Sequence, residues 1–349
     1  MTGYLRVPLS ALDVAPVWTD SSATHSLRNT IALAERVEEF GYVRFWVAEH
    51  HNVPSLATAA TAVLVGAVAG ATSTIRVGSG GVLLPNHPPL IVAEQFGTLE
   101  ALHPGRIDLG VGRAPGSLSP LTAQLLRRAE VDSDDDFQAQ IAELTSYFST
   151  LGDEQAASAH AGAAAENRPP MVLLGSSPGS ARLAGGLGLP YAYAHHINPT
   201  ATVASLAAYH ETFRPSTRFE RPYAIIASLV FVADSDGAAR ELAAPFLAGQ
   251  VQMRSGSPDA LFPTPEQAAD FPYTPAQRVW ARDRLDHQVW GSPQRVRDQV
   301  TELFRTTGAD ELMAVTMVYD HASRIHSYEL LAEAVGHVPA GIRECFISH

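Results

Sequence analysis

The feature that most constrains the fold of this chain is the alternation of short apolar runs with longer segments whose apolar residues recur at helical spacing. The short runs are apolar throughout, which is typical of parallel strands covered by helices on both faces. We expect eight such strands, at residues 6–9, 45–47, 75–78, 107–111, 171–174, 191–194, 223–232 and 312–317. Eight βα units favour a closed (β/α)8 TIM barrel over a doubly wound open sheet.

Helices are expected beside these strands, at residues 27–40, 57–71, 88–102, 137–150, 177–187 and 321–335. The chain has 349 residues, of which 46% are apolar, and this is enough for one large barrel with insertions. No linker divides it, so we predict a single domain over residues 1–349. The glycine fingerprint of an open dinucleotide-binding sheet is missing after the first strand. Gly110 and Gly112 lie near the fourth strand, without a third glycine in register.

Two segments interrupt the alternation. Residues 151–168 are rich in alanine and low in complexity, which predicts a surface insertion. Residues 250–275 carry five prolines among glycine, serine and aspartate. A loop of this length in a compact domain is often a lid over the active site, although a disordered insertion would have the same composition.

Charge and composition exclude several classes of function. The net charge is −12 and no basic block is present, so a nucleic-acid backbone would be repelled. The longest apolar run, residues 57–71, is too short and too rich in alanine to span a bilayer. Cys345 is the single cysteine, which excludes an internal disulfide and fits a reducing compartment. The first eight residues do not resemble a signal peptide, so we expect a cytoplasmic protein.

In a (β/α)8 barrel the active site lies at the carboxyl ends of the strands. Five expected loops there are rich in glycine or in polar residues: 48–52, 78–81, 112–116, 175–180 and 195–196. The segment 175–180 leads directly into a helix, where backbone N–H groups and serine hydroxyls suit a phosphate group. An ordinary turn with a serine N-cap is the equal alternative. Arg113 could supply a cation to the same phosphate. The adjacent Gly80 and Gly81 predict either a flat ligand packed against the backbone or a simple bulge.

The histidine pairs admit two kinds of chemistry. Glu49, His50 and His51 suggest a metal site or acid–base catalysis, but adjacent residues of an extended segment point to opposite faces, so both imidazoles are not expected on one ion. No further residues complete a zinc set at a typical spacing, and we predict no metal site. We favour a general base or proton donor, with a buried structural histidine as the alternative. The pair formed by His195 and His196 has the same two interpretations.

The order of these segments resembles a known family. The run FWVAEHHNVP, then VGSGGVLLPNHPPLIVAEQFGTLEALHPGRIDLGVGRAPG, then VLLGSSPGSARLAGGLGLPYAYAHH, is similar to the bacterial luciferase-like flavin-dependent monooxygenases. The resemblance is close over residues 5–197 and looser beyond. Within the family the chain looks most like the single-component group that includes tailoring oxygenases of polyketide pathways.

The resemblance implies an FMN-dependent monooxygenase. Reduced FMN would come from a separate flavin reductase, and O2 would add at the flavin C4a to give a peroxyflavin that oxygenates a small organic substrate. His50 matches the catalytic histidine, and Gly80–Gly81 matches a cis peptide beneath the flavin ring. The resemblance also implies a homodimer formed through the early helices, and a mobile loop at residues 250–275. The expected cofactor-binding residues are Ala48, Gly80, Gly81, Arg113, Gly175, Ser176, Ser177, Ser180, Ala194 and His195.

Three alternatives stay open at this stage. The barrel could bind the deazaflavin F420 and transfer hydride, or it could be a non-catalytic flavin-binding partner subunit. A metal-dependent hydrolase would rest on the histidine pairs alone. Gly112 stands where the luciferase heavy chain has a reactive cysteine, so light emission is not inferred. The organic substrate is not predicted, because an apolar pocket accepts many of them.

Overall fold

A computed structural model of the chain describes residues 6–116, 120–126, 134–149 and 161–336. All strand pairs of its central sheet are parallel. The strands are β1 (Leu9–Asp13), β2 (Arg44–Val47), β3 (Arg76–Ser79), β4 (Val82–Leu83), β5 (Ile107–Gly112), β6 (Met171–Gly175), β7 (Tyr191–Tyr193), β8 (Ala224–Val232), β9 (Val289–Gly291) and β10 (Glu311–Val315). Eight of them form a ring in the order β1, β2, β3, β5, β6, β7, β8 and β10, and β10 pairs with β1 to close it. The predicted (β/α)8 barrel is confirmed.

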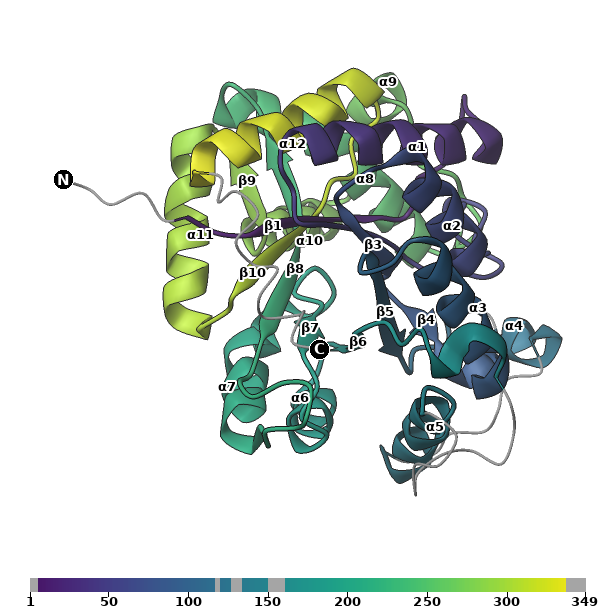
Figure 1. The fold of residues 1–349 in the computed structure, drawn as a ribbon. Helices are drawn as coiled ribbons and strands as arrows, with labels where there is room; N and C mark the ends of the chain where they lie inside the picture. Colours follow the sequence, from purple (N-terminus) through teal and green to yellow (C-terminus); the bar gives the residue numbers. More distant parts are fainter. Residues whose placement is uncertain (1–5, 117–119, 127–133, 150–160, 337–349) are drawn as a thin grey trace.

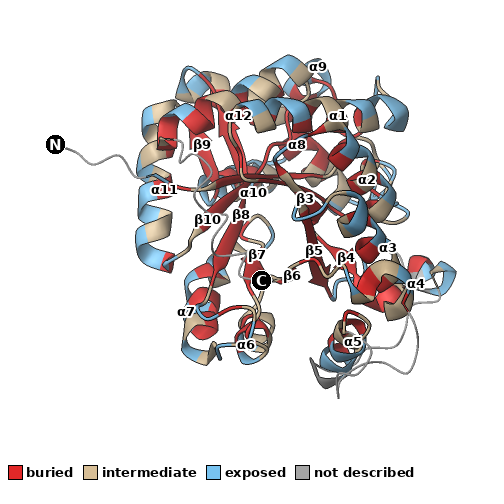
Figure 2. Cartoon of the chain, viewed as in Figure 1, coloured by how far each residue is buried: buried red, intermediate tan, exposed pale blue. Residues whose placement is uncertain are grey.

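Helices surround this ring on all sides (Figure 1). They are α1 (Ala23–Glu39), α2 (Thr61–Ala71), α3 (Pro89–Leu102), α4 (Pro120–Leu125), α5 (Asp134–Ser146), α6 (Pro178–Gly186), α7 (Thr202–Thr212), α8 (Asp236–Arg254), α9 (Pro265–Ala269), α10 (Pro275–Asp286), α11 (Pro293–Thr307) and α12 (His321–Val335). Buried residues gather on the strands and on the inner faces of the helices, as Figure 2 shows. None of the helices within the described ranges is long and apolar enough to cross a membrane.

The first strand was predicted at the wrong residues. The expected range was 6–9, whereas β1 runs from Leu9 to Asp13 and is buried throughout. Ser10 and Asp13 made this stretch look unlike a buried strand. Both polar side chains find partners from distant parts of the chain: Ser10 donates to Glu311, and Asp13 accepts from Arg324 over 2.7 Å. Burial of a polar group is tolerated when it is hydrogen-bonded in this way.

Other boundaries also differ from expectation. Helix α2 begins at Thr61 rather than at residue 57, because residues 57–60 are not helical and the Ala57 N–H donates to the Ala15 carbonyl over 3.0 Å. The short strands β4 and β9 were not predicted. Strand β9 lies outside the ring and pairs with the last residues of β8. Helix α5 ends at Ser146, and residue 150, where this helix was expected to end, lies outside the described residues.

Both interrupting segments contain secondary structure. Residues 150–160 lie outside the described part, but η2 (Gly162–Ala165) packs on α3, and the Ala164 side chain is fully buried there. Residues 250–254 belong to α8, and residues 265–269 form α9. Between them, Phe262 exchanges backbone hydrogen bonds with Val17 and Thr19 in the loop after β1. The segment is therefore tied to the carboxyl end of the barrel, and its action as a lid stays a prediction.

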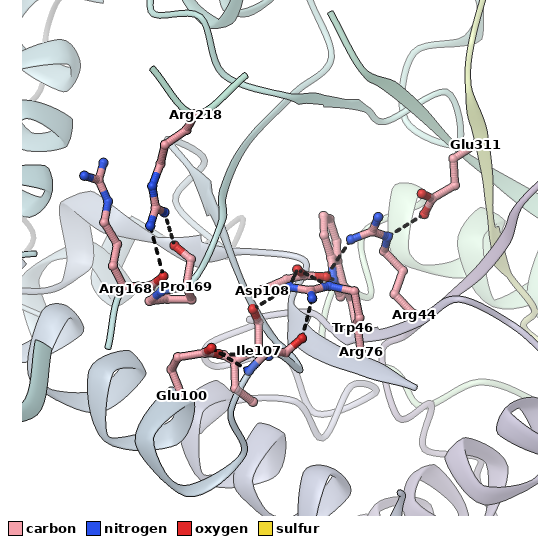
Figure 3. Close-up of polar contacts among 11 residues, drawn as sticks. Arg44, Trp46, Arg76, Glu100, Ile107, Asp108, Arg168, Pro169, Arg218 and Glu311 are labelled. Carbon is pink, nitrogen blue, oxygen red and sulfur yellow. Dashed lines mark hydrogen bonds and ion pairs between the residues drawn. The ribbon is translucent and has the colours of Figure 1, made fainter. Parts of the chain in front are cut away.

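A network of buried ions fills the opposite, amino-terminal end of the barrel (Figure 3). Arg44, the first residue of β2, lies between Asp108 at 2.7 Å and Glu311 at 2.8 Å. Arg76 also contacts Asp108, at 2.6 Å, and Tyr223 donates to Glu311 over 2.7 Å. Burial raises the pKa of Asp108, but the charges of Arg76 and Arg44 outweigh it and leave that pKa below its usual value. This end of the barrel is thus occupied by structural side chains, which leaves the other end for chemistry.

Candidate active site

The loops that follow β2, β3, β5, β6 and β7 meet at the carboxyl end of the barrel. Backbone hydrogen bonds continue the strand ladders into these loops: Gly80 N–H donates to Val47 over 2.8 Å, and Ala194 N–H donates to Gly175 over 2.8 Å. Because the strands are parallel and in register, the residues just after them gather at one rim. We call this rim the mouth of the barrel. It brings together the segments in which all the predicted site residues lie.

His50 lies at the mouth, three residues after Val47, the last residue of β2. Its backbone N–H donates to the Thr58 carbonyl over 2.8 Å, and its Nδ1 lies 3.3 Å from the Thr58 hydroxyl. The imidazole is half-buried. Burial lowers the pKa of His50 to about 4, although the charge of Glu49 acts in the opposite direction. The ring is therefore neutral near pH 7, and it can accept or donate a hydrogen bond.

Gly80 and Gly81 form the turn between β3 and β4, and the peptide bond between them is cis, which is the geometry that the resemblance implied. Neither position has room for a side chain. A Cβ on Gly80 would lie 2.6 Å from the Leu12 side chain, and one on Gly81 would lie 2.7 Å from the Gly110 carbonyl oxygen. Gly80 is partly exposed at this point of the mouth, whereas Gly81 is buried, and neither has a side chain of its own.

The segment from β6 into α6 contains the predicted phosphate site. Ser177 is the N-cap of α6, the role that the turn interpretation gives to a serine here, and it forms a capping box with Ser180. The Ser180 hydroxyl also lies 2.8 Å from that of Tyr191, and a Cβ on Gly175 would collide with it. Residues 174–180 are all partly exposed, in contrast to the buried first half of β6. An accessible, capped helix N-terminus is compatible with an anion as well as with a turn.

The remaining predicted residues line the same rim. Arg113 follows β5 directly and is exposed, whereas Ala48 is buried. Ser176 is fixed through its carbonyl, which accepts from the Asn198 side chain over 3.0 Å. Ala194 follows β7 and is partly exposed. Arg113, Ser176 and the start of α6 thus follow the neighbouring strands β5 and β6, as a shared phosphate site requires.

The two histidines after β7 differ in their surroundings. Both ring nitrogens of His195 are engaged within the protein, with the Thr202 hydroxyl at 2.7 Å and the His287 carbonyl at 2.7 Å. His196 uses Nδ1 for the Ala227 carbonyl at 2.9 Å. Burial lowers the pKa of His196 to about 4, and the nearby His50 contributes in the same direction. His196 therefore lies within electrostatic reach of His50. Sequence reasoning assigned the His195–His196 pair the same two interpretations as His50, but only His195 was expected at the cofactor. The only sequence signal for His196 was its place beside His195.

A second group missed by the sequence analysis surrounds Glu49. His51 Nε2 and His87 Nε2 each lie 2.8 Å from the same oxygen, Oε1, of this carboxylate. The other oxygen accepts from the Leu83 N–H over 3.3 Å. Burial raises the pKa of Glu49, but the hydrogen bonds and charges of the two histidines outweigh it and lower the pKa to about 2. His87 follows η1 (Leu84–Asn86), 38 residues after Glu49, and no local pattern links the two.

The parallel barrel and the polar groups around its mouth define an enzyme of the (β/α)8 class. The chain belongs to the luciferase-like monooxygenase family, whose model matches residues 8–311. Among curated proteins, it is 43% identical to the uncharacterized protein YvbT of Bacillus subtilis and 41% identical to a luciferase-like monooxygenase of Escherichia coli. Each match spans 93% of this chain and 96% of the relative. An N-acetyl-S-alkylcysteine monooxygenase of Bacillus subtilis is 31% identical, over 94% of this chain and 98% of its own length.

Solved structures of other proteins match the fold of this chain. The structure of MsnO8 without ligand is 38% identical and superposes with a TM-score of 0.88, over 96% of this chain and all of that one. Two others share the fold alone, each with a TM-score of 0.66. They are the oxygenating constituent of 3,6-diketocamphane monooxygenase from Pseudomonas putida in complex with FMN, at 19% identity over 97% of this chain and all of that one, and an F420-dependent secondary alcohol dehydrogenase, at 17% over 95% of this chain and 99% of that one.

Proposed function

We propose that this protein is an FMN-dependent monooxygenase that oxygenates a small organic substrate at the mouth of its barrel. The observation that carries the proposal is the joint position of His50, the Gly80–Gly81 turn and the accessible start of α6 around one rim. A flat ring with a phosphate tail needs these three features: a surface without side chains, a cradle for the anion, and a group that handles protons.

The residues present fit FMN. The start of α6 offers backbone N–H groups and a positive helix end, Ser176 and Ser177 are partly exposed there, and Arg113 follows the adjacent strand. Together they form a donor set suited to a phosphate dianion. The Gly80–Gly81 turn would accept the ring, with Ala48 and Ala194 at its edge. FMN in its reduced form supplies the two electrons with which one atom of O2 enters the substrate and the other leaves as water.

The chain's own part in the chemistry centres on His50. Its neutral imidazole, held by the Thr58 hydroxyl, would take up or deliver the proton that accompanies oxygen transfer. The segment 250–275, anchored at Phe262 to the loop after β1, would restrict the entry of water. His195 would support this rim through its hydrogen bonds to Thr202 and His287. Because both of its ring nitrogens are already engaged there, neither would bond to the flavin.

Three partner assignments belong to the same proposal. A separate flavin reductase would deliver the reduced FMN, and the enzyme would act in the cytoplasm, in keeping with its single cysteine. A second copy of the chain would cover the outer faces of α2 and α3. Those neighbouring helices expose Val63, Ile91 and Leu102 to solvent, and exposed apolar side chains that cluster on one face are typical of an interface.

Cofactor binding and oxygen use test the proposal directly. We expect the purified protein to quench FMN fluorescence with a micromolar dissociation constant, and to consume O2 beyond the reductase background when NADH, a flavin reductase and a substrate are supplied. A parallel assay with reduced F420 and an oxidised substrate distinguishes the hydride-transfer alternative. Turnover with F420 and none with FMN would overturn the proposal, as would the absence of any affinity for FMN.

A matched pair of arginine variants tests the phosphate site. Arg113→Ala should weaken FMN binding by about 10- to 100-fold, the effect of losing a charge-assisted contact of about 1.5–3 kcal/mol. Riboflavin, which has no phosphate, should bind the variant and the wild type alike. The control is Arg36→Ala, which removes a 45% exposed arginine on α1 and should leave both affinities unchanged. Equal loss for FMN and riboflavin would show that Arg113 does not contact the phosphate.

A further inference from the structure

Three potential metal ligands converge beside the proposed flavin site. The carboxylate of Glu49 and the Nε2 atoms of His51 and His87 all lie within 4.8 Å of one another, and Glu49 is buried. Both imidazoles approach the same carboxylate oxygen, at 2.8 Å each. The three side chains come from two separate segments, the loop after β2 and the residue after η1. Their convergence is therefore a property of the folded barrel.

We propose that Glu49, His51 and His87 bind one divalent transition-metal ion of the zinc class. Two imidazoles and one carboxylate are the protein ligands of many open zinc sites, with water or another ligand in the fourth position. Around a tetrahedral ion with bonds of about 2.0–2.1 Å, neighbouring ligand atoms lie about 3.3 Å apart. The two Nε2–Oε1 distances of 2.8 Å would each lengthen by about half an ångström to reach that spacing.

The backbone already holds the ligands in place. The His51 N–H donates to the Gly116 carbonyl over 3.0 Å, and the His87 N–H donates to Leu84 over 3.0 Å. The second carboxylate oxygen of Glu49 is held by the Leu83 N–H. An ion would meet three ligands on two anchored segments, so little conformational entropy is lost on binding.

A fourth coordination position at this site would face solvent. The side chain of His87 is 29% exposed and that of His51 is 16% exposed, whereas that of Glu49 is 2% exposed. An ion could therefore enter past His87 and keep one water. The mixed nitrogen and oxygen ligands favour Zn²⁺, Co²⁺ or Fe²⁺ over Mg²⁺ and Ca²⁺, which prefer oxygen alone.

This site differs from the one that the sequence analysis rejected. That argument concerned His50 and His51 as joint ligands, and the structure agrees that they diverge, since His50 contacts Thr58 while His51 contacts Glu49. The new partner is His87. The alternative is a purely hydrogen-bonded cluster in which the Glu49 carboxylate accepts a hydrogen bond from each imidazole and no ion binds. In that case the protein binds no Zn²⁺.

Metal titration of chelator-treated protein distinguishes a metal site from a purely hydrogen-bonded cluster. Zn²⁺ added in a calorimeter should bind with a stoichiometry of one per chain, and Co²⁺ should give the intense visible bands of a four-coordinate ion. His87→Gln should weaken Zn²⁺ binding by about 100-fold or more and abolish the Co²⁺ bands, because a ligand is lost from a three-ligand site. His87 lies at the rim, so this variant is expected to fold, and its circular dichroism spectrum checks that it does.

The control variant is His326→Gln, which removes a half-exposed histidine that lies near two carboxylates on the outer surface. It should leave both metal signals unchanged. The proposal is overturned if no Zn²⁺ binds, if His87→Gln binds as tightly as the wild type, or if the control loses the signal equally. All these measurements are made without flavin, so a failure of the metal proposal can be told apart from a failure of the monooxygenase proposal.

Discussion

At the scale of single residues, His50 has the most direct consequence for chemistry. It lies at the mouth, it is held by Thr58, and burial keeps it neutral. We expect His50→Ala to bind FMN within about twofold of the wild type but to lose about 100- to 10,000-fold in substrate turnover, the usual contribution of a positioned proton-transfer group. Stopped-flow flavin spectra and product analysis measure the two effects separately.

A half-buried histidine away from the mouth provides the control for this variant. His103 is the C-cap of α3, and its Nδ1 lies 3.4 Å from Nη2 of Arg106. His103→Ala should leave turnover intact. If His50→Ala turned over substrate normally, the catalytic assignment would be wrong, and His196 would be the next residue to test, because it lies within electrostatic reach of His50.

The same residues show how far the sequence could predict the site. Residues of one loop or strand end were predictable, because chain order places them together: Glu49, His50 and His51 after β2, and Ser177 with Ser180 at the start of α6. The contact between Glu49 and His87 was not predictable, since it joins segments 38 residues apart. Such a contact depends on the register of the barrel, and no short-range pattern encodes it.

At the scale of elements, the strands that were predicted well are those whose residues are uniformly apolar. Strand β8 was found almost to the residue because all nine of its residues are buried and all but Ser228 are apolar. Strand β1 was misplaced because its polar residues depend on Glu311 and Arg324, which lie about 300 residues away. Strand β9 has only three residues and pairs only with an extension of β8, so it carries too little pattern to be recognised.

One helix end offers a pH-dependent test. Glu38, in the last turn of α1, accepts the backbone N–H groups of Ser73, Thr74 and Ile75 in the loop before β3, at 2.5–3.1 Å. Burial raises the pKa of Glu38, but these donors outweigh it, and the net pKa lies below the ordinary value of 4.5. A depressed pKa means that the stabilisation is complete above the ordinary value and is lost as pH falls through the folded-state value.

We therefore expect Glu38→Gln to lower the free energy of unfolding by about 1–3 kcal/mol at pH 7, in line with hydrogen bonds to a charged group. The difference from the wild type should shrink as the pH is lowered below the depressed pKa, where both side chains are neutral. Urea denaturation across this pH range measures it. Glu35→Gln, at an exposed position one turn earlier on α1, is the control and should change little. A difference that stayed constant with pH would contradict the ionic origin of the effect.

At the scale of the whole molecule, the two ends of the barrel have different tasks. The amino-terminal end is held by Arg44, which joins β2 to Asp108 of β5 and Glu311 of β10. Removing one partner of a buried ion cluster leaves the others uncompensated. Arg44→Met should lower the free energy of unfolding by about 3–5 kcal/mol, as measured by urea denaturation. Arg282→Met, which breaks an exposed pair with Asp286, should cost less than about 1 kcal/mol. Equal losses would show that the buried network has no special role in closing the barrel.

The outside of the molecule carries the last prediction. Ile91 and Leu102 are 43% and 69% exposed on α3. They are eleven residues apart, which is about three helical turns, so they share one face. Val63, 75% exposed, lies on the neighbouring α2. An exposed apolar face of this kind suits a twofold dimer.

Sedimentation of the wild type at micromolar concentration should therefore give twice the chain mass, and the double variant Ile91→Asp with Leu102→Asp should give a monomer, because paired carboxylates would be desolvated in the interface. Val279→Asp is the matched control: this valine is 70% exposed but lies on α10, and its variant should remain a dimer. If both variants sedimented like the wild type, the face formed by α2 and α3 would not be where two copies meet. The mouth lies at the end of the strands while this face lies on the flank of the ring, so the monomeric variant should still bind FMN, and its flavin affinity shows whether each barrel holds its cofactor alone.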